Sequence, residues 1–183
     1  LKSDPIVKFI KKQNFSFKNI LEIGCSSGYR LNYLKKYTHK GNYFGIDPSK
    51  EAIEHGKKKF KNISLKIGTA DNLEFDNQSF DLLIFGFCLY LCDRSDLFKI
   101  SFEADRVLKK KGLIIIYDFY SKNHFSNKYK HTSGIKSYKM NYSKIFLCNP
   151  NYFLLEKKIF KHNLKAKLSL NNKLGLFVIE KKL

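Results

Sequence analysis

The sequence predicts an α/β fold in which a mainly parallel sheet of seven strands carries helices on both faces and ends in an antiparallel hairpin. Apolar runs alternate with helical patterns between residues 19 and 118. The run at 80–85 has the apolar character expected of a strand buried on both faces. Residues 19–47 read as a strand, a glycine turn, a helix and a second strand that ends in an acid. With 183 residues, we expect one domain spanning 1–183.

The apolar periodicity assigns the elements of the parallel part in order. A helix at 5–12 has Ile6, Phe9 and Ile10 on one face. Ser49 is expected to cap a helix that runs to about residue 60, because a serine oxygen accepts from the first free N–H groups. Further helices are expected at 29–37 and 95–108. The strands are expected at 19–24, 42–47, 63–68, 80–85 and 113–118.

The pattern changes after residue 118. Residues 119–150 are rich in Tyr, Lys, Ser, His and Asn and keep no clear period, apart from a short helix expected at 141–148. A long insertion of this kind usually forms a lid or a binding loop. Two strands follow at 153–160 and 174–180, and their short connection predicts an antiparallel hairpin.

The turn after the first strand indicates the kind of ligand. It runs from Glu22 through Gly24 and Ser26 to Gly28. A dinucleotide fingerprint would need glycines where Ser26 and Tyr29 stand, and the Gly-Lys-Ser/Thr ending of a phosphate loop is absent. An acid beside the ligand argues against a pyrophosphate and for a cationic group. Ser26 is small enough for the turn but would be strained at a positive φ.

The second strand ends on Asp47, which can accept from both hydroxyls of a ribose; the alternative is a role in capping the next helix. The motif Glu22-x-Gly24-x-Ser26-x-Gly28 resembles the first motif of the class I S-adenosylmethionine-dependent methyltransferases, acid-x-Gly-x-Gly-x-Gly. Three further segments resemble the same family in the family's order, so the likeness covers residues 20–118. These segments are Gly68–Phe75, Ser79–Phe85 and Ala104–Gly112.

The resemblance implies a Rossmann-like fold with a final antiparallel strand beside the fifth, S-adenosylmethionine as cofactor, and methyl transfer. Thr69 stands where many relatives have an adenine-contacting Asp, so that contact passes to Asp71 or to the backbone of Ala70. Glu22 either bonds the turn N–H groups or contacts the methionine end of the cofactor. The implied cofactor-binding residues are Glu22, Gly24, Cys25, Ser26, Gly28, Asp47, Pro48, Ala70, Asp71 and Phe87.

Catalysis has no obvious residue, because methyl transfer from a sulfonium mainly requires the donor and acceptor to be held in line. Candidates for a proton acceptor are Tyr90 after the fourth strand and His124 and His131 in the insertion. The alternatives are a core or rim tyrosine and surface histidines. We expect 119–150 to close over a polar acceptor, either a small molecule or a glycan precursor. A catalytically silent cofactor-binding subunit of a complex is the alternative from another class.

The net charge of +19 raises the alternative of an RNA methyltransferase. Arg, which suits phosphate and base recognition, occurs only at 30, 94 and 106, and the lysines are dispersed. We therefore expect no specific nucleic-acid partner.

The four cysteines, Cys25, Cys88, Cys92 and Cys148, lack zinc-ligand spacing, so we expect reduced thiols and no metal. With neither a signal peptide nor a membrane span expected, the predicted location is cytoplasmic.

Overall fold

The computed structural model describes residues 1–13, 15–38, 41–129, 131–132, 134–161 and 173–182. The helices are α1 (Pro5–Gln13), α2 (Tyr29–Leu34), α3 (Lys50–Lys59), α4 (Leu97–Val107) and α5 (Lys144–Leu147), with a 3₁₀ turn, η1 (Arg94–Asp96), before α4. The main sheet contains β1 (Asn19–Ile23), β2 (Asn42–Asp47), β3 (Ser64–Ile67), β4 (Phe80–Gly86), β5 (Leu108–Phe119), β8 (Tyr152–Lys161) and β9 (Lys173–Lys181). The fold class predicted from the sequence is confirmed.

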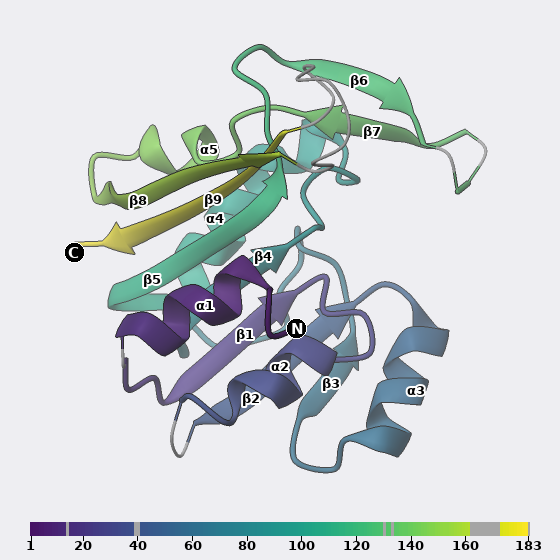
Figure 1. The fold of residues 1–183 in the computed structure, drawn as a ribbon, viewed down its shortest axis with the longest axis vertical. Helices are drawn as coiled ribbons and strands as arrows, with labels where there is room; N and C mark the ends of the chain where they lie inside the picture. Colours follow the sequence, from purple (N-terminus) through teal and green to yellow (C-terminus); the bar gives the residue numbers. More distant parts are fainter. Residues whose placement is uncertain (14, 39–40, 130, 133, 162–172, 183) are drawn as a thin grey trace.

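The seven strands lie in the order β3-β2-β1-β4-β5-β9-β8 (Figure 1). The first five pair in parallel, and β9 runs antiparallel between β5 and β8, as predicted. The connection between β8 and β9, expected to be short, lies outside the described residues. The strand order reverses at β1, whose neighbours are β2 and β4. In open α/β sheets a ligand binds at this point, beyond the carboxyl ends of the strands.

Two apolar layers cover the sheet. Buried residues of α1, α2 and α3 pack on one face, and those of α4 and α5 on the other. Figure 1 shows α1 and α2 in front of the sheet and α4 behind it. The side chains of β4 are buried on both faces except that of Asp81, which is half-buried. This two-sided burial explains the continuous apolar run that predicted the strand.

Two element boundaries differ from the expected ones. Helix α2 ends at Leu34 instead of residue 37, because the next N–H groups form a tighter turn in which the Tyr37 N–H donates to Leu34 O (2.8 Å). Strand β5 begins at Leu108 instead of 113, because Leu108 already pairs with Phe80 across an irregular register. Lys111, at φ 61°, occupies the strained position of that irregular stretch.

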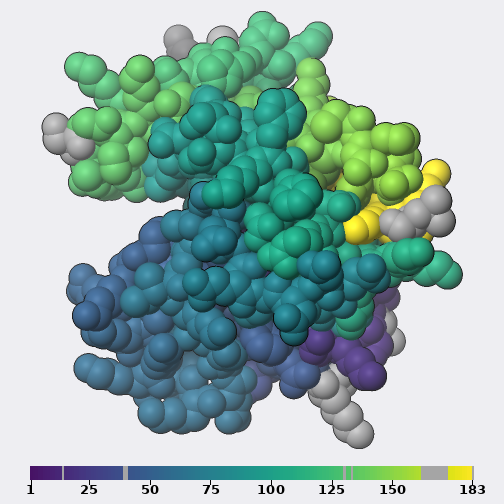
Figure 2. Space-filling model, turned by 180° about the vertical axis from the view of Figure 1, so that it is seen from behind, coloured from purple at the N-terminus to yellow at the C-terminus, as the bar shows by residue number. Residues whose placement is uncertain are grey.

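The insertion at 119–150 contains a hairpin that the sequence did not predict, β6 (Phe125–Lys128) paired with β7 (Lys136–Lys139). The Tyr138 N–H donates to Tyr90 O (2.8 Å), which ties the hairpin to the turn after β4. Figure 2 shows the surface hollowed between this part of the chain (green) and the part that contains α3 (blue). The short helix expected within 141–148 is α5. Within the described residues, no helix has the length and apolar character needed to cross a membrane.

Candidate functional site

The turn after β1 is built around backbone conformations that favour glycine. Gly24 has φ 74° and Gly28 has φ 76°. A Cβ at Gly24 would lie 2.3 Å from the Cys88 Cβ, so only glycine fits against the turn after β4. Ser26 stands at φ 49°, the strained conformation anticipated for the residue at the family's middle glycine.

Asp47 joins the ends of β1 and β2. Its Oδ2 accepts from the Ser26 N–H (2.8 Å) and its Oδ1 from the Ser49 N–H (2.9 Å). The side chain that caps α3 is Ser49, whose Oγ accepts from the Ala52 N–H (3.2 Å). The half-buried Asp47 carboxylate therefore fixes the turn after β1, while Ser49 caps helix α3.

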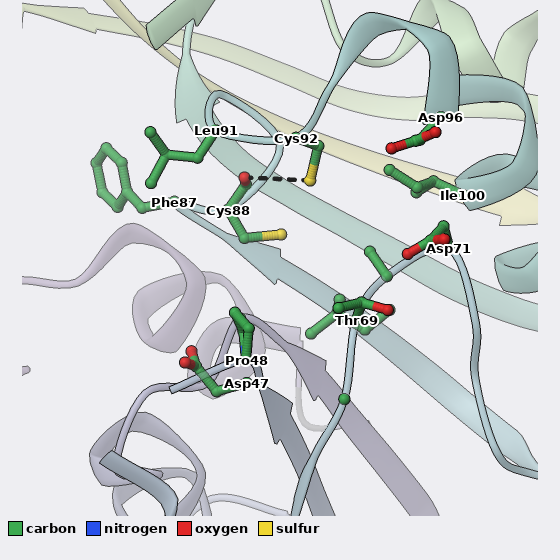
Figure 3. A pocket seen from close by; sticks show the side chains of 14 residues that line it. Asp47, Pro48, Thr69, Asp71, Phe87, Cys88, Leu91, Cys92, Asp96 and Ile100 are labelled. Carbon is green, nitrogen blue, oxygen red and sulfur yellow. Dashed lines mark hydrogen bonds between the residues drawn. The ribbon is translucent and has the colours of Figure 1, made fainter. Parts of the chain in front are cut away.

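A cavity of about 360 Å³ opens at the carboxyl ends of β1, β2 and β4. Six residues predicted to bind the cofactor line it: Gly24, Asp47, Pro48, Ala70, Asp71 and Phe87. Figure 3 shows Asp47 and Pro48 on one side, Thr69 and Asp71 on a second, and the turn after β4 on a third. The remaining four, Glu22, Cys25, Ser26 and Gly28, are not among the lining residues.

Thr69, which the sequence placed at the family's adenine-contacting position, also lines the wall. The sequence did not identify the other residues of this wall, which are Ile23, Gly68, Cys88, Leu91, Cys92, Asp96 and Ile100. Asp96 and Ile100 come from η1 and α4. These elements lie at the cavity because α4 packs against one face of the sheet. No local signal distinguishes them from ordinary helix residues. Gly68 and Thr69 lie inside the segment that carried the family resemblance, so that segment was the signal for them.

Glu22 is buried at the end of β1, where it forms an ion pair with Arg30. The Arg30 Nε also donates to Asp4 Oδ2 (2.9 Å). Burial raises the pKa of Glu22 to about 7, against the opposing effect of the Arg30 guanidinium. The expected bonds from Glu22 to the turn N–H groups are not formed, because the N–H groups of Gly24 and Cys25 donate to Ile46 O (2.9 and 3.0 Å). Among the described residues, the Glu22 Oε2 has no hydrogen-bond partner.

Phe87 connects the cavity to a group of aromatic rings. Its φ of 59° is strained for a bulky side chain, and its N–H donates to Tyr117 O (2.9 Å). Its ring lies 4.9 Å from the ring of Tyr117 and 5.6 Å from that of Phe119, centre to centre. Strained residues concentrate at functional sites, and this one forms part of the cavity wall.

The segment after β3 supplies the polar side of the cavity. A side-chain hydrogen bond from Thr69 lowers the pKa of Asp71, and Lys99 lies 3.3 Å from the Asp71 carboxylate. The Leu73 N–H donates to Glu103 Oε2 (2.8 Å), so α4 holds this segment in position. Thr69 and Asp71 both line the cavity, as does Ala70.

The three candidate proton acceptors lie outside the cavity lining. The half-buried Tyr90 ring lies 5.0 Å from that of Phe119 and 6.1 Å from that of Tyr129. Burial raises the pKa of Tyr90, which opposes loss of its proton. His124 and His131 are exposed on the insertion, beside Tyr138 and Tyr129 respectively.

A buried carboxylate that the sequence did not single out lies at the end of β5. Asp118 accepts from the Phe119 N–H (2.7 Å) and the Tyr90 N–H (3.3 Å), which fixes the turn after β4. Burial raises the pKa of Asp118 to about 7. Asp118 thus supports the cavity wall from behind.

A family model described as "Methyltransferase domain" matches residues 20–112. A demethylmenaquinone methyltransferase of Staphylococcus saprophyticus is 33% identical over 113 residues, which cover 59% of this chain and 48% of that protein. A phthiotriol/phenolphthiotriol dimycocerosates methyltransferase of Mycobacterium leprae is 38% identical over 73 residues, 39% of this chain and 27% of that protein. The chain therefore spans less than half the length of these two curated relatives.

The overall fold is similar to that of solved structures. A crystal structure of a SAM-dependent methyltransferase from Methanosarcina mazei has a TM-score of 0.76 at 18% identity, covering 98% of each chain. The YcgJ protein of Bacillus subtilis has a TM-score of 0.69 at 17% identity, covering 97% of this chain and 98% of that one. At these identities the likeness concerns the fold.

Proposed function

The chain belongs to the methyltransferase domain family, whose methyl donor is S-adenosylmethionine, and from this premise we propose that it methylates a small molecule that carries an anionic group. The charge of the cavity is the observation that supports binding of the donor there. The chain has a net charge of +19, yet the lining residues that the structure describes include Asp47, Asp71 and Asp96 and neither Lys nor Arg. Such a wall favours a cationic ligand over a pyrophosphate.

The residues present fit this donor. We propose that Asp47 accepts from the ribose hydroxyls, while Thr69, Ala70 and Asp71 form the adenine side. Glycine at position 24 lets the backbone approach the methionine end closely. The buried Glu22 Oε2, which has no partner among the described residues, supports the proposal that Glu22 accepts from the ammonium of that end.

The donor supplies a methyl group already activated by a positive sulfur. The chain's own residues then have to orient the two reactants and exclude water. The β6–β7 hairpin, held to the turn after β4 through the Tyr138–Tyr90 hydrogen bond, supports our proposal that 119–150 covers the acceptor side. The ring of Tyr90 contacts both Phe119 and Tyr129, so its first role in this proposal is packing.

A second cavity, of about 410 Å³, supports the acceptor class. Phe87 lines the donor cavity, and its ring lies 4.9 Å from that of Tyr117, which lines the second cavity. None of the described lining residues of the second cavity comes from 119–150, so we propose that this cavity holds the far end of an acceptor whose reacting end lies under 119–150. Its wall combines apolar and aromatic side chains with lysines, and the described part of the chain contributes no acid to it. Its lining residues are Ser3, Pro5, Lys8, Phe9, Lys12, Tyr117, Lys158, Phe160, Lys161 and Leu176.

An apolar floor with a basic rim suits a small molecule with an apolar body and a phosphate or carboxylate. Lys158 pairs with Glu156, whereas no ion pair joins Lys8, Lys12 or Lys161 to a described residue. The two curated relatives are named for demethylmenaquinone and for phthiotriol and phenolphthiotriol dimycocerosates, which are small molecules. We also propose that the protein is located in the cytoplasm.

The acceptor side is tested with phenyl phosphate as the probe and phenol as its neutral control. We expect phenyl phosphate to perturb the Tyr117 and Phe160 ring signals in NMR and phenol to perturb them much less. The double variant Lys8→Glu/Lys12→Glu should abolish this binding, whereas Lys57→Glu/Lys58→Glu on α3 should not. Equal binding of both probes, or equal loss in both double variants, would contradict an anion-selective site.

His124 and His131 remain candidate bases and are tested by separate replacement with Ala. A general base contributes about a hundredfold or more to turnover. If either replacement lowers methyl transfer by that factor while S-adenosylhomocysteine affinity holds, that histidine is the base. If neither replacement slows methyl transfer, neither histidine is the base. The exposed position of both side chains fits this outcome, in which the reaction depends on the orientation of the reactants.

The lysines also keep the RNA alternative open to test. Binding driven only by counterion release falls steeply with salt and ignores sequence. We expect tRNA to bind only in this weak manner, and sequence-selective binding at physiological salt would replace the small-molecule acceptor by RNA. The alternative of a silent cofactor-binding subunit would be supported by cofactor binding together with turnover that appears only when a partner chain is added.

A further inference from the structure

Two of the four cysteines form a pair on the wall of the donor cavity. Cys88 follows β4 and Cys92 precedes η1, and both line the cavity. Figure 3 shows both sulfur atoms directed into the space between the Asp47–Pro48 and Thr69–Asp71 walls. The Cys92 thiol donates to Cys88 O (3.5 Å). The two cysteines therefore share one short turn, and their thiols face the same cavity.

The turn between the two cysteines is held in place on both sides. Arg94 donates to the carbonyls of Leu89 (2.8 Å) and Cys92, and its guanidinium lies 4.2 Å from the centre of the Tyr138 ring. Asp118 accepts from the Tyr90 N–H within the same turn. A pair of thiols fixed in this way loses little conformational freedom when they are joined.

The surroundings of the two thiols are unequal. The hydrogen bond from the Cys88 thiol and the nearby Arg94 lower the pKa of Cys92, against burial and the carboxylates of Asp118 and Asp71. The pKa of Cys88 is raised by its bond to Cys92, by burial and by the charges of Asp118 and Glu22. Arg94 donates to Cys92 O and so places its cation beside Cys92, which favours Cys92 as the attacking thiol and leaves Cys88 as the resolving thiol.

We propose that Cys88 and Cys92 are a thiol–disulfide exchange site that controls access to the donor cavity, with a low-molecular-weight disulfide as the oxidant. The Cys92 thiolate attacks one sulfur of the oxidant, forming a mixed disulfide and releasing one thiolate. Cys88 then passes its proton to the released thiolate and attacks the Cys92 sulfur, and the second thiolate that leaves takes a proton from solvent. Two electrons pass from the protein to the oxidant, which leaves as two thiols.

The control of access rests on the proposed function, and it follows from where the sulfur atoms lie. The Cys88 Sγ is 3.3 Å from the Cβ position at Gly24, so this side chain touches the turn that would receive the methionine end. A mixed disulfide at Cys92 would fill the cavity, and an internal disulfide would draw the two sulfur atoms together and so change the wall that both residues form. Either product removes the shape that fits the donor.

The experiment uses the Cys148→Ser variant and the parent protein, incubated with oxidised glutathione and mapped by mass spectrometry. Cys148 is exposed and lies outside the cavity, so in the parent it reports on simple accessibility. We expect Cys92 to react before Cys148 and a Cys88–Cys92 disulfide to accumulate. Cys88→Ser should stop at the glutathione adduct of Cys92, and dithiothreitol should reverse both products. Saturating S-adenosylhomocysteine should protect Cys92 and leave Cys148 reactive.

Oxidation should lower S-adenosylhomocysteine affinity by about tenfold or more, measured by calorimetry before and after dithiothreitol. If Cys148 reacts while Cys88 and Cys92 stay reduced, the exchange site is overturned. If the disulfide forms and affinity is unchanged, control of access is overturned. The peptide map is independent of cofactor binding, so a reduced protein that never binds S-adenosylhomocysteine refutes the proposed donor site without hiding the thiol chemistry.

Discussion

Replacing Asp47 by Ala separates its structural role from its proposed ribose contact. The sequence alone predicts lower cofactor affinity with an unchanged melting temperature. The structure revises the second part, because the carboxylate already accepts from the Ser26 and Ser49 N–H groups at 2.8 and 2.9 Å. Losing two such bonds at a half-buried position should cost about 1–2 kcal/mol of unfolding free energy. For a chain of this size that lowers the melting temperature by about 2–8 °C.

The affinity change is measured separately, by titrating S-adenosylhomocysteine into folded protein below the melting transition. Loss of charge-assisted bonds to the ribose should weaken binding by about tenfold or more. Glu54→Ala is the matched control, because it removes one exposed carboxylate from the neighbouring helix α3 and should leave both quantities nearly unchanged. If Asp47→Ala lowers the melting temperature and binds S-adenosylhomocysteine as the parent does, Asp47 only orders the turn.

Three further predictions concern the strained and buried groups. Ser26→Gly should raise the unfolding free energy in urea by up to about 1 kcal/mol, because it relieves the positive φ and keeps the N–H that Asp47 accepts from; a loss of stability would refute this. Arg30→Met should lower the unfolding free energy by about 3–5 kcal/mol, because it leaves the Glu22 carboxylate buried without its cation. Adding Glu22→Leu should restore most of the lost stability, and a double variant that stays as unstable would mean that the buried charge is not the cause. Because burial raises the pKa of Asp118 to about 7, the folded protein keeps a proton on it between pH about 4 and 7, and the unfolding free energy should fall by up to about 4 kcal/mol as pH rises through this window. Asp118→Asn should remove this part of the pH dependence and leave the part that Glu22 contributes with the same sign. An unchanged pH dependence in the variant would reject Asp118 as the titrating group.

Local signals in the sequence predicted the part of the site that lies at strand ends. The apolar runs located the strands, and parallel strands bring their carboxyl ends to one edge, so Gly24, Asp47 and Phe87 could be expected to meet. The N-cap at Ser49 was predictable because capping depends on residues three apart.

The remaining features depend on contacts between distant segments. Arg30 takes the side chain of Glu22 as its partner and reaches Asp4, 26 residues earlier, which no spacing rule anticipates. Ile100 reaches the cavity because α4 packs across the sheet. The β6–β7 hairpin was missed because its strands are only four residues long and largely polar, so the alternation that identifies strands is too short to stand out.

The central claim, that the acidic cavity beyond β1, β2 and β4 binds S-adenosylmethionine, is tested most directly by calorimetry with S-adenosylhomocysteine and NAD⁺ on the reduced protein. We predict micromolar binding of S-adenosylhomocysteine, the usual scale for metabolite sites, and much weaker binding of NAD⁺, whose pyrophosphate would face Asp47. Tighter binding of NAD⁺, or a folded protein that binds no S-adenosylhomocysteine, would contradict the claim.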